Sequence, residues 1–219
     1  MSLSTQGNAL SLSVPGVAVL TAGVAVAAAG TILGLRRMDY ERVPQVALLS
    51  AAFFVVSFIR VPLGLTSVHL VLNGLIGLLL GWAAFPALLI ALFLQAVLLG
   101  FGGLTTLGIN TTTMALPAVV CYYLFHPMVQ SRRELVALLG AFAAGVTAFV
   151  LSLLLVGSAL LAAGTEFRGF AQAFVVVDLP VALVEGMVSG GVVAFLRKVR
   201  PETLEAPLLA RDRLEMSDA

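Results

Sequence analysis

The sequence predicts an all-α, polytopic membrane protein with seven transmembrane helices. Of its 219 residues, 60% are hydrophobic and 11% are charged, and the mean hydropathy is +1.10. A soluble domain carries about a quarter charged residues, so this chain could not cover its surface in water. Six or seven apolar stretches fill most of the chain, and the basic residues between them sort almost entirely onto one side.

Each apolar stretch is judged against the roughly 20 residues that a helix needs to cross the hydrocarbon. The region from Val68 to Leu99 is long enough for two short crossings, with a break near Gly81–Trp82 or at Pro86. Turn-rich or glycine-rich connections flank it, at residues 60–67 and 100–108. The other predicted spans are Val14–Leu35, Pro44–Ile59, a span that follows the glycine-rich connection and ends near Phe125, Leu135–Ala163, and Phe170–Leu196.

The basic residues set the orientation, because positive charges near span ends stay in the cytoplasm. Seven crossings place the N-terminus outside and the C-terminus inside, with only Arg60 and Arg168 in outward loops. Six crossings would result if Val68–Leu99 crossed once, but Arg132 and Arg133 would then lie outside, so seven is favoured. The cytoplasmic set is Arg36, Arg37, Arg42, Arg132, Arg133, Arg197, Lys198 and Arg200.

The expected organisation is one helical domain over residues 1–200 and a charged cytoplasmic tail over 201–219, in a prokaryotic inner membrane.

The sequence gives no support to several other functions and features. No basic stripe indicates nucleic acid, and the single cysteine, Cys121, excludes an internal disulfide. There is no phosphate-binding Gly-x-x-x-x-Gly-Lys loop, and Ser189 has no histidine at its depth, so we expect no enzyme activity.

Polar side chains gather at the outward ends of the predicted spans. His69 and Asn110 lie there, and so does Asp178, whose apolar surroundings call for a partner. Arg60 is the candidate partner. The pair is either a structural ion pair at the membrane edge or part of a pocket for a small polar or charged substrate.

Other polar and small residues lie within the spans. Glu185 is about two helical turns below Asp178, and it is either a structural clamp across the bundle or a proton relay. Asn73 and Gln95 either bond neighbouring helices or face a cavity. Small residues spaced four apart, at Gly23 and Ala27 and at Ala141 and Gly145, allow helices to approach closely and suggest where partners dock.

Three segments resemble those of cobalt or nickel energy-coupling-factor transporters, in the membrane subunit that captures the substrate, and the first two are specific motifs. Residues 61–70, Val-Pro-Leu-Gly-Leu-Thr-Ser-Val-His-Leu, are similar to that family's turn before a metal-binding histidine. Residues 102–110, Gly-Gly-Leu-Thr-Thr-Leu-Gly-Ile-Asn, resemble its glycine-rich loop, and Glu185-Gly186 with Val199-Arg200-Pro201 resembles its closing helix. The match runs in order from about Pro44 to Leu204.

The resemblance implies a seven-helix subunit that delivers Co²⁺ or Ni²⁺, as substrate and with no resident cofactor, to a transmembrane coupling subunit and cytoplasmic ATPases. A small accessory membrane subunit is a further expected partner, and lipid surrounds the chain. The implied metal ligands are His69 and the Met1 amine. The implied pocket and supporting residues are Arg60, Thr66, Ser67, Gly102, Gly103, Thr105, Asn110 and Asp178.

The departures from the family bear on the substrate. Relatives begin Met-His, whereas this sequence begins Met1-Ser2 and has no histidine before His69. Arg60 and Asp178 stand where many relatives carry histidine. Since Ni²⁺ and Co²⁺ prefer several nitrogen ligands, we expect weak metal binding by this chain. One alternative is a subunit that keeps the fold, has lost metal binding and serves another substrate or assembly role. A weaker one is a secondary transporter that relays protons through Asp178 and Glu185.

Overall fold

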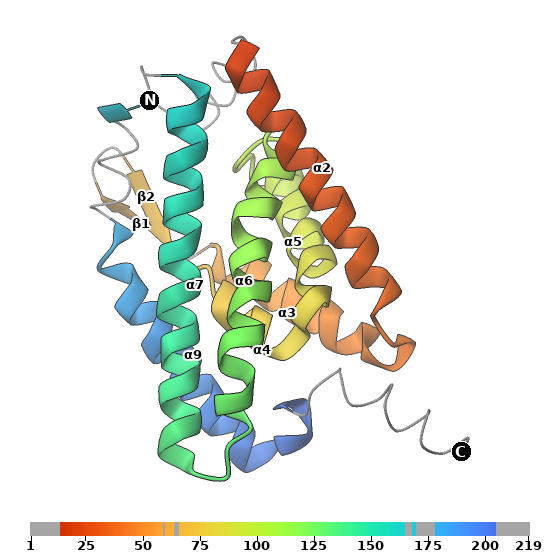
Figure 1. Ribbon diagram of the computed structural model, residues 1–219, viewed down its shortest axis with the longest axis vertical. Helices are drawn as coiled ribbons and strands as arrows, with labels where there is room; N and C mark the ends of the chain where they lie inside the picture. The colour runs from red at the N-terminus through yellow and green to blue at the C-terminus, as the bar shows by residue number, and fades with distance from the viewer. Residues whose placement is uncertain (1–13, 59, 64–65, 165–167, 170–177, 205–219) are drawn as a thin grey trace.

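A computed structural model describes residues 14–58, 60–63, 66–164, 168–169 and 178–204. Seven helices and a two-stranded hairpin make up most of this part (Figure 1). The helices are α2 (Val14–Arg36), α3 (Val43–Val56), α4 (Asn73–Leu80), α5 (Ala84–Leu98), α6 (Leu107–Val129), α7 (Glu134–Ala163) and α9 (Val181–Val199). Short 3-10 turns are η1 (Tyr40–Arg42), η2 (Gly81–Ala83) and η4 (Pro201–Leu204).

Helix α6 lies in the middle of the bundle and packs against α2, α4, α5 and α7, while α9 packs along α7 (Figure 1). The predicted helical membrane architecture is confirmed. Four helical stretches in the described part are long and apolar enough to cross a membrane: Gly16–Arg36, Asn73–Leu98, Leu107–Val129 and Glu134–Ala163. Helix α3 is apolar but shorter, and α9 carries Glu185, Arg197 and Lys198 among its apolar residues.

The connection at residues 60–67, predicted as a turn without regular structure, contributes to two short strands. Strand β1 (Arg60–Leu63) pairs antiparallel with β2 (Thr66–His69), and Arg60 lies opposite His69. Both strands are edges, so Pro62, which has no N–H to donate, does not interrupt a larger sheet. The β-branched Val61 and Val68 face each other in the register, as suits a hairpin.

The long apolar region after the hairpin breaks where the sequence predicted. Helix α4 ends at Leu80, and Gly81 has φ +54°, which a glycine adopts without the steric cost of a Cβ. Helix α4 begins after Leu72, which is left-handed at φ +50°. All eight residues of α4 are buried, so this helix lies inside the bundle and exposes no face to lipid.

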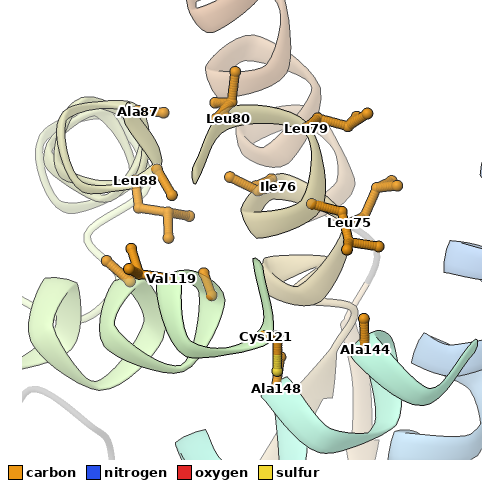
Figure 2. Packing of buried hydrophobic residues seen from close by; sticks show 14 of the residues in the cluster. Leu75, Ile76, Leu79, Leu80, Ala87, Leu88, Val119, Cys121, Ala144 and Ala148 are labelled. Atoms are coloured by element: carbon orange, nitrogen blue, oxygen red, sulfur yellow. The ribbon is translucent and has the colours of Figure 1, made fainter. Parts of the chain in front are cut away.

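Glycines bring the helices around α4 into close contact. A Cβ at Gly74 would lie 2.6 Å from the Ala144 carbonyl oxygen of α7, and one at Gly77 would overlap the Ala118 carbonyl of α6. Figure 2 shows the apolar contacts between these helices, which include Leu75, Ile76, Val119 and Ala148.

The small residues singled out in the sequence also lie at helix contacts. A Cβ at Gly23 would lie 2.7 Å from the Ile109 Cα, and one at Gly145 would lie 2.7 Å from the Glu185 carbonyl oxygen. Ala27 and Ala141 are buried. At Gly23 and Gly145 the close approach is therefore to other segments of this chain, and not to a partner as the spacing suggested.

Basic residues at the ends of α2 and α9 contact the last turns of α6 and the residues just after it. The Arg197 guanidinium of α9 donates to the carbonyl oxygens of Val129 (2.8 Å), the last residue of α6, and Ser131 (2.9 Å). At the end of α2, the Arg37 guanidinium lies 5.2 Å from the centre of the Trp82 ring and donates to the Tyr123 hydroxyl of α6 at 3.5 Å. These contacts place basic groups from distant parts of the sequence on one side, as the charge pattern indicated.

Candidate metal-capture site

The candidate ligand His69 is the last residue of β2, and three residues separate it from the start of α4. The hairpin register brings its backbone opposite Arg60, one of the predicted pocket residues. The other predicted residues of this turn, Thr66 and Ser67, pair with Leu63 and Pro62. The hairpin therefore brings Arg60 and His69 together, and the short connection Leu70–Leu72 joins them to the buried start of α4.

That connection is held by an acidic side chain from the far end of the sequence. The Glu185 carboxyl group on α9 accepts a short hydrogen bond from the Val71 N–H at one oxygen, and the Leu72 N–H donates to the other at 2.8 Å. Glu185 is fully buried. Val71 is buried and Leu72 is partly buried, and both precede the first residue of α4, so Glu185 satisfies donors that would otherwise lie inside the protein without an acceptor.

The first residue of α4 is held by two further helices. The Asn73 side-chain amide donates to the Ser152 hydroxyl of α7 at 2.7 Å, and to the carbonyl oxygens of Met114 and Ala148 at 3.4 Å each. The side-chain oxygen of Asn73, Oδ1, accepts a hydrogen bond from the Gly74 N–H at 3.0 Å. Asn73 thus bonds across α6 and α7, as in the helix-bonding reading of the sequence. Gln95 is also buried, but its Nε2 has no hydrogen-bond partner in the described part of the chain.

The glycine-rich loop between α5 and α6 folds back on the first turn of α6. Gly102 and Gly103 have φ of +78° and +77°, and the Thr106 hydroxyl donates to both of their carbonyl oxygens. The Asn110 side-chain amide donates to that hydroxyl at 3.3 Å. A Cβ at Gly102 would lie 3.0 Å from the Asn110 amide nitrogen. The structure therefore brings Asn110 together with Gly102, whereas Thr105 is exposed.

Asp178 lies shortly before α9 and is buried, with 4% of its surface exposed. Its Oδ1 atom has no hydrogen-bond partner among the residues that the structure describes. The predicted pairing of Asp178 with Arg60 depends on an arginine side chain that the structure does not describe. Met1 also lies outside the described residues. The described side chains contain no group of three or more His, Cys, Asp or Glu that could hold a metal ion.

Two contributors to this region were not predicted from the sequence. Thr106 organises the loop, and Ser152 accepts the bond from Asn73. Thr106 stood inside the recognised loop motif, and its place four residues before Asn110 indicates a shared helix face. Ser152 gave no local signal, because it lies within an ordinary apolar helix.

Several helices that are long and apolar enough to cross a membrane define a multi-pass membrane protein. The chain belongs to the family described as the cobalt uptake substrate-specific transmembrane region, whose model matches residues 13–203. Its fold is similar to a crystal structure of a transition metal transporter, with a TM-score of 0.65 and 27% identity over 84% of this chain and 88% of that one.

Two relatives show the same association with metal transport. A Haemophilus influenzae protein named for metal transport is 41% identical over 196 residues, which cover 85% of this chain and 91% of the relative. The cobalt transport protein CbiM of Sorangium cellulosum is 37% identical over 175 residues, covering 74% of this chain and 76% of that protein. The family resemblance read from the two motifs is therefore confirmed.

Proposed function

We propose that this chain is the substrate-capture subunit of an energy-coupling-factor importer for Co²⁺ or Ni²⁺. The observation that carries the proposal is His69 at the end of a hairpin whose connection to α4 is bonded to the bundle by Glu185 and Asn73. An imidazole on an anchored backbone suits ions that prefer nitrogen ligands. The names of its relatives support the choice of cargo.

In this proposal the chain crosses the membrane seven times, with the N-terminus and the hairpin outside. His69 supplies an imidazole nitrogen, and further nitrogen ligands come from the N-terminal segment, including the Met1 amine. Asn110 and the glycine-rich loop are supporting residues of the site, as the family resemblance implies. A transmembrane coupling subunit and cytoplasmic ATPases drive release, since the sequence carries no nucleotide-binding loop of its own.

The test is calorimetric titration of the full chain in detergent with Ni²⁺ and with Co²⁺. We expect His69→Ala to abolish binding. The chain's other histidine, His126, is buried beside Tyr122 on the late turns of α6, so His126→Ala is the matched control and should leave the affinity unchanged. Tight binding that survives His69→Ala would show that the site lies elsewhere.

A second version of the chain, in which Met1-Ser2 is rebuilt as a Met-His start of the length found in relatives, tests the N-terminal contribution. We expect weak binding by the present sequence and tighter binding by the rebuilt one, because an imidazole and an amide are added to the ligand set. Absence of binding by both versions would favour the alternative that this subunit keeps the fold without capturing metal.

Partnership is tested separately by expression with a candidate coupling subunit and its ATPases. We expect the chain to co-purify with them. Metal uptake into proteoliposomes that contain this chain alone would contradict the proposal and would indicate a secondary transporter.

A further inference from the structure

The backbone between His69 and α4 turns sharply and enters the buried part of the molecule within three residues. Leu72 is left-handed, a conformation that is strained for a residue with a Cβ and persists only when the surroundings impose it. Val71 is buried and Leu72 is partly buried, so their N–H groups need acceptors inside the protein. The shape of this connection therefore depends on what accepts those two hydrogens.

Both acceptors belong to one side chain on a different helix. The two oxygens of Glu185 take one N–H each, across 114 and 113 residues of sequence. The geometry is two-pronged, so it fixes the direction of the connection as well as its distance from α9. An acidic group at the N-terminal end of a helix is also favoured by the helix dipole, and here that end is the start of α4.

The neighbouring residue is bonded to the other two helices of this region. Asn73 joins the first residue of α4 to α6 and α7 through Met114, Ala148 and Ser152. A Cβ at Gly145 of α7 would meet the Glu185 carbonyl oxygen at 2.7 Å, so the segment of α9 that carries Glu185 is itself held closely against α7. Residues 71–73 are thus attached to three helices, and His69 lies two residues before the first of them.

We propose that Glu185 is a positioning residue for His69. By accepting hydrogen bonds from the Val71 and Leu72 N–H groups, it fixes the backbone that follows His69 relative to α9, and so sets the position of the histidine. The inference rests on the proposed capture of metal at His69, and it makes α9 the helix that determines metal affinity without contributing a ligand. Supporting interactions of this kind are worth about 10–100-fold in metal affinity.

The test compares three variants of the full chain in detergent, in the version with the rebuilt Met-His start. Glu185→Gln keeps one acceptor oxygen and turns an amide N–H₂ toward the other backbone donor. Glu185→Ala removes both acceptors. Ser189→Ala is the matched control, because Ser189 is one turn further along α9, is fully buried, and has a hydroxyl without a hydrogen-bond partner in the described part of the chain.

Titration with Ni²⁺ separates positioning from folding. We expect Glu185→Gln to raise the Kd about 10–100-fold while the stoichiometry stays that of the unaltered chain, and Ser189→Ala to change neither. An unchanged Kd in Glu185→Gln would overturn the proposal. A reduced stoichiometry at unchanged Kd would also overturn it, because it would mean that Glu185 serves folding alone.

Amide hydrogen exchange measures the two hydrogen bonds to Glu185 directly, without metal. We expect the Val71 and Leu72 amides to exchange faster in Glu185→Gln and faster still in Glu185→Ala, with Ser189→Ala unchanged. If no version of the chain binds metal, the proposed function fails, while the exchange rates still decide whether Glu185 holds this connection. Unaltered protection of both amides in Glu185→Ala would overturn the positioning role.

Discussion

At the scale of single residues, the informative groups are the polar side chains buried among apolar helices. Polar groups in such surroundings are costly unless they are bonded. Glu185 and Asn73 meet this requirement through backbone groups around the start of α4. Asp178 differs, since its Oδ1 has no hydrogen-bond partner among the described residues. Glu185 and Asn73 therefore hold the start of α4, whereas Asp178 is one of several buried polar side chains that lack a partner in the described part of the chain.

Asn73→Ala should lower the stability of the folded protein by about 1–3 kcal/mol. The substitution removes three donated bonds and leaves the Gly74 N–H without its side-chain acceptor. Ser152→Ala removes only one of these bonds and should cost less. Thermal unfolding in detergent, followed by circular dichroism, measures both. Equal losses for the two variants would contradict a role for Asn73 beyond its bond to Ser152.

At the scale of elements, glycines set the distance between helices. Small residues allow backbones to approach closely in lipid, where packing rather than hydrophobic burial drives helix association. Gly77 lies against the backbone of α6 and Gly145 against that of α9. Their positions explain why α4, only eight residues long, is surrounded on all sides.

Gly77→Ala should destabilise the bundle by about 1–3 kcal/mol, because the added methyl group overlaps the Ala118 carbonyl and forces α4 away from α6. Gly191→Ala is the control. A Cβ at Gly191 meets nothing within 4 Å, so the better helix propensity of alanine should stabilise α9 slightly. The two melting temperatures should move in opposite directions. A shift of both in the same direction would refute the packing argument.

The glycine-rich loop allows a second paired test. Gly100 and Gly102 are both left-handed, at φ +66° and +78°, but only at Gly102 would a Cβ meet another group, the Asn110 amide. Gly100→Ala should cost roughly 1–2 kcal/mol from backbone strain alone. Gly102→Ala should cost more and should also weaken Ni²⁺ binding, because Asn110 is displaced. Equal Ni²⁺ affinity in the two variants would argue against a supporting role for Asn110.

At the scale of the whole molecule, the distribution of charge is the governing feature. Arg37 and Arg197 come from opposite ends of the sequence, yet both bond to the late part of α6 or the residues just after it. The hairpin and the start of α9 lie away from this basic end (Figure 1). Positive charge near span ends faces the cytoplasm, so the candidate site should face the other side.

Cysteine labelling tests this orientation. Cys121, the chain's one cysteine, is fully buried, so replacing it with alanine gives a quiet background. A cysteine at Arg133, before α7, should react with an impermeant reagent only in inside-out vesicles. A cysteine at Gly164, after the other end of α7, should react only in right-side-out vesicles. If position 133 were labelled only from the outside, the orientation would be the opposite of the one proposed.

Much of the architecture could be read from the sequence, because it depends on local properties. The length and apolarity of the segments 14–35 and 135–163 predict helices that the structure places at Val14–Arg36 and Glu134–Ala163. The break near Gly81 follows from a residue that tolerates positive φ. The motifs around His69 and Asn110 indicate the family from the sequence alone, since each is continuous in the chain.

Only the tertiary structure decided how those motifs are held. The hairpin at Arg60–His69 was predicted as a loop, because four-residue strands containing Pro62 give almost no periodic signal. Asn73 and Glu185 were recognised as buried polar residues, but their partners lie up to 114 residues away. Composition and spacing show that a buried carboxyl group needs donors. Which donors it meets depends on the packing of α9 against α7 and α4, and that packing is a property of the folded chain as a whole.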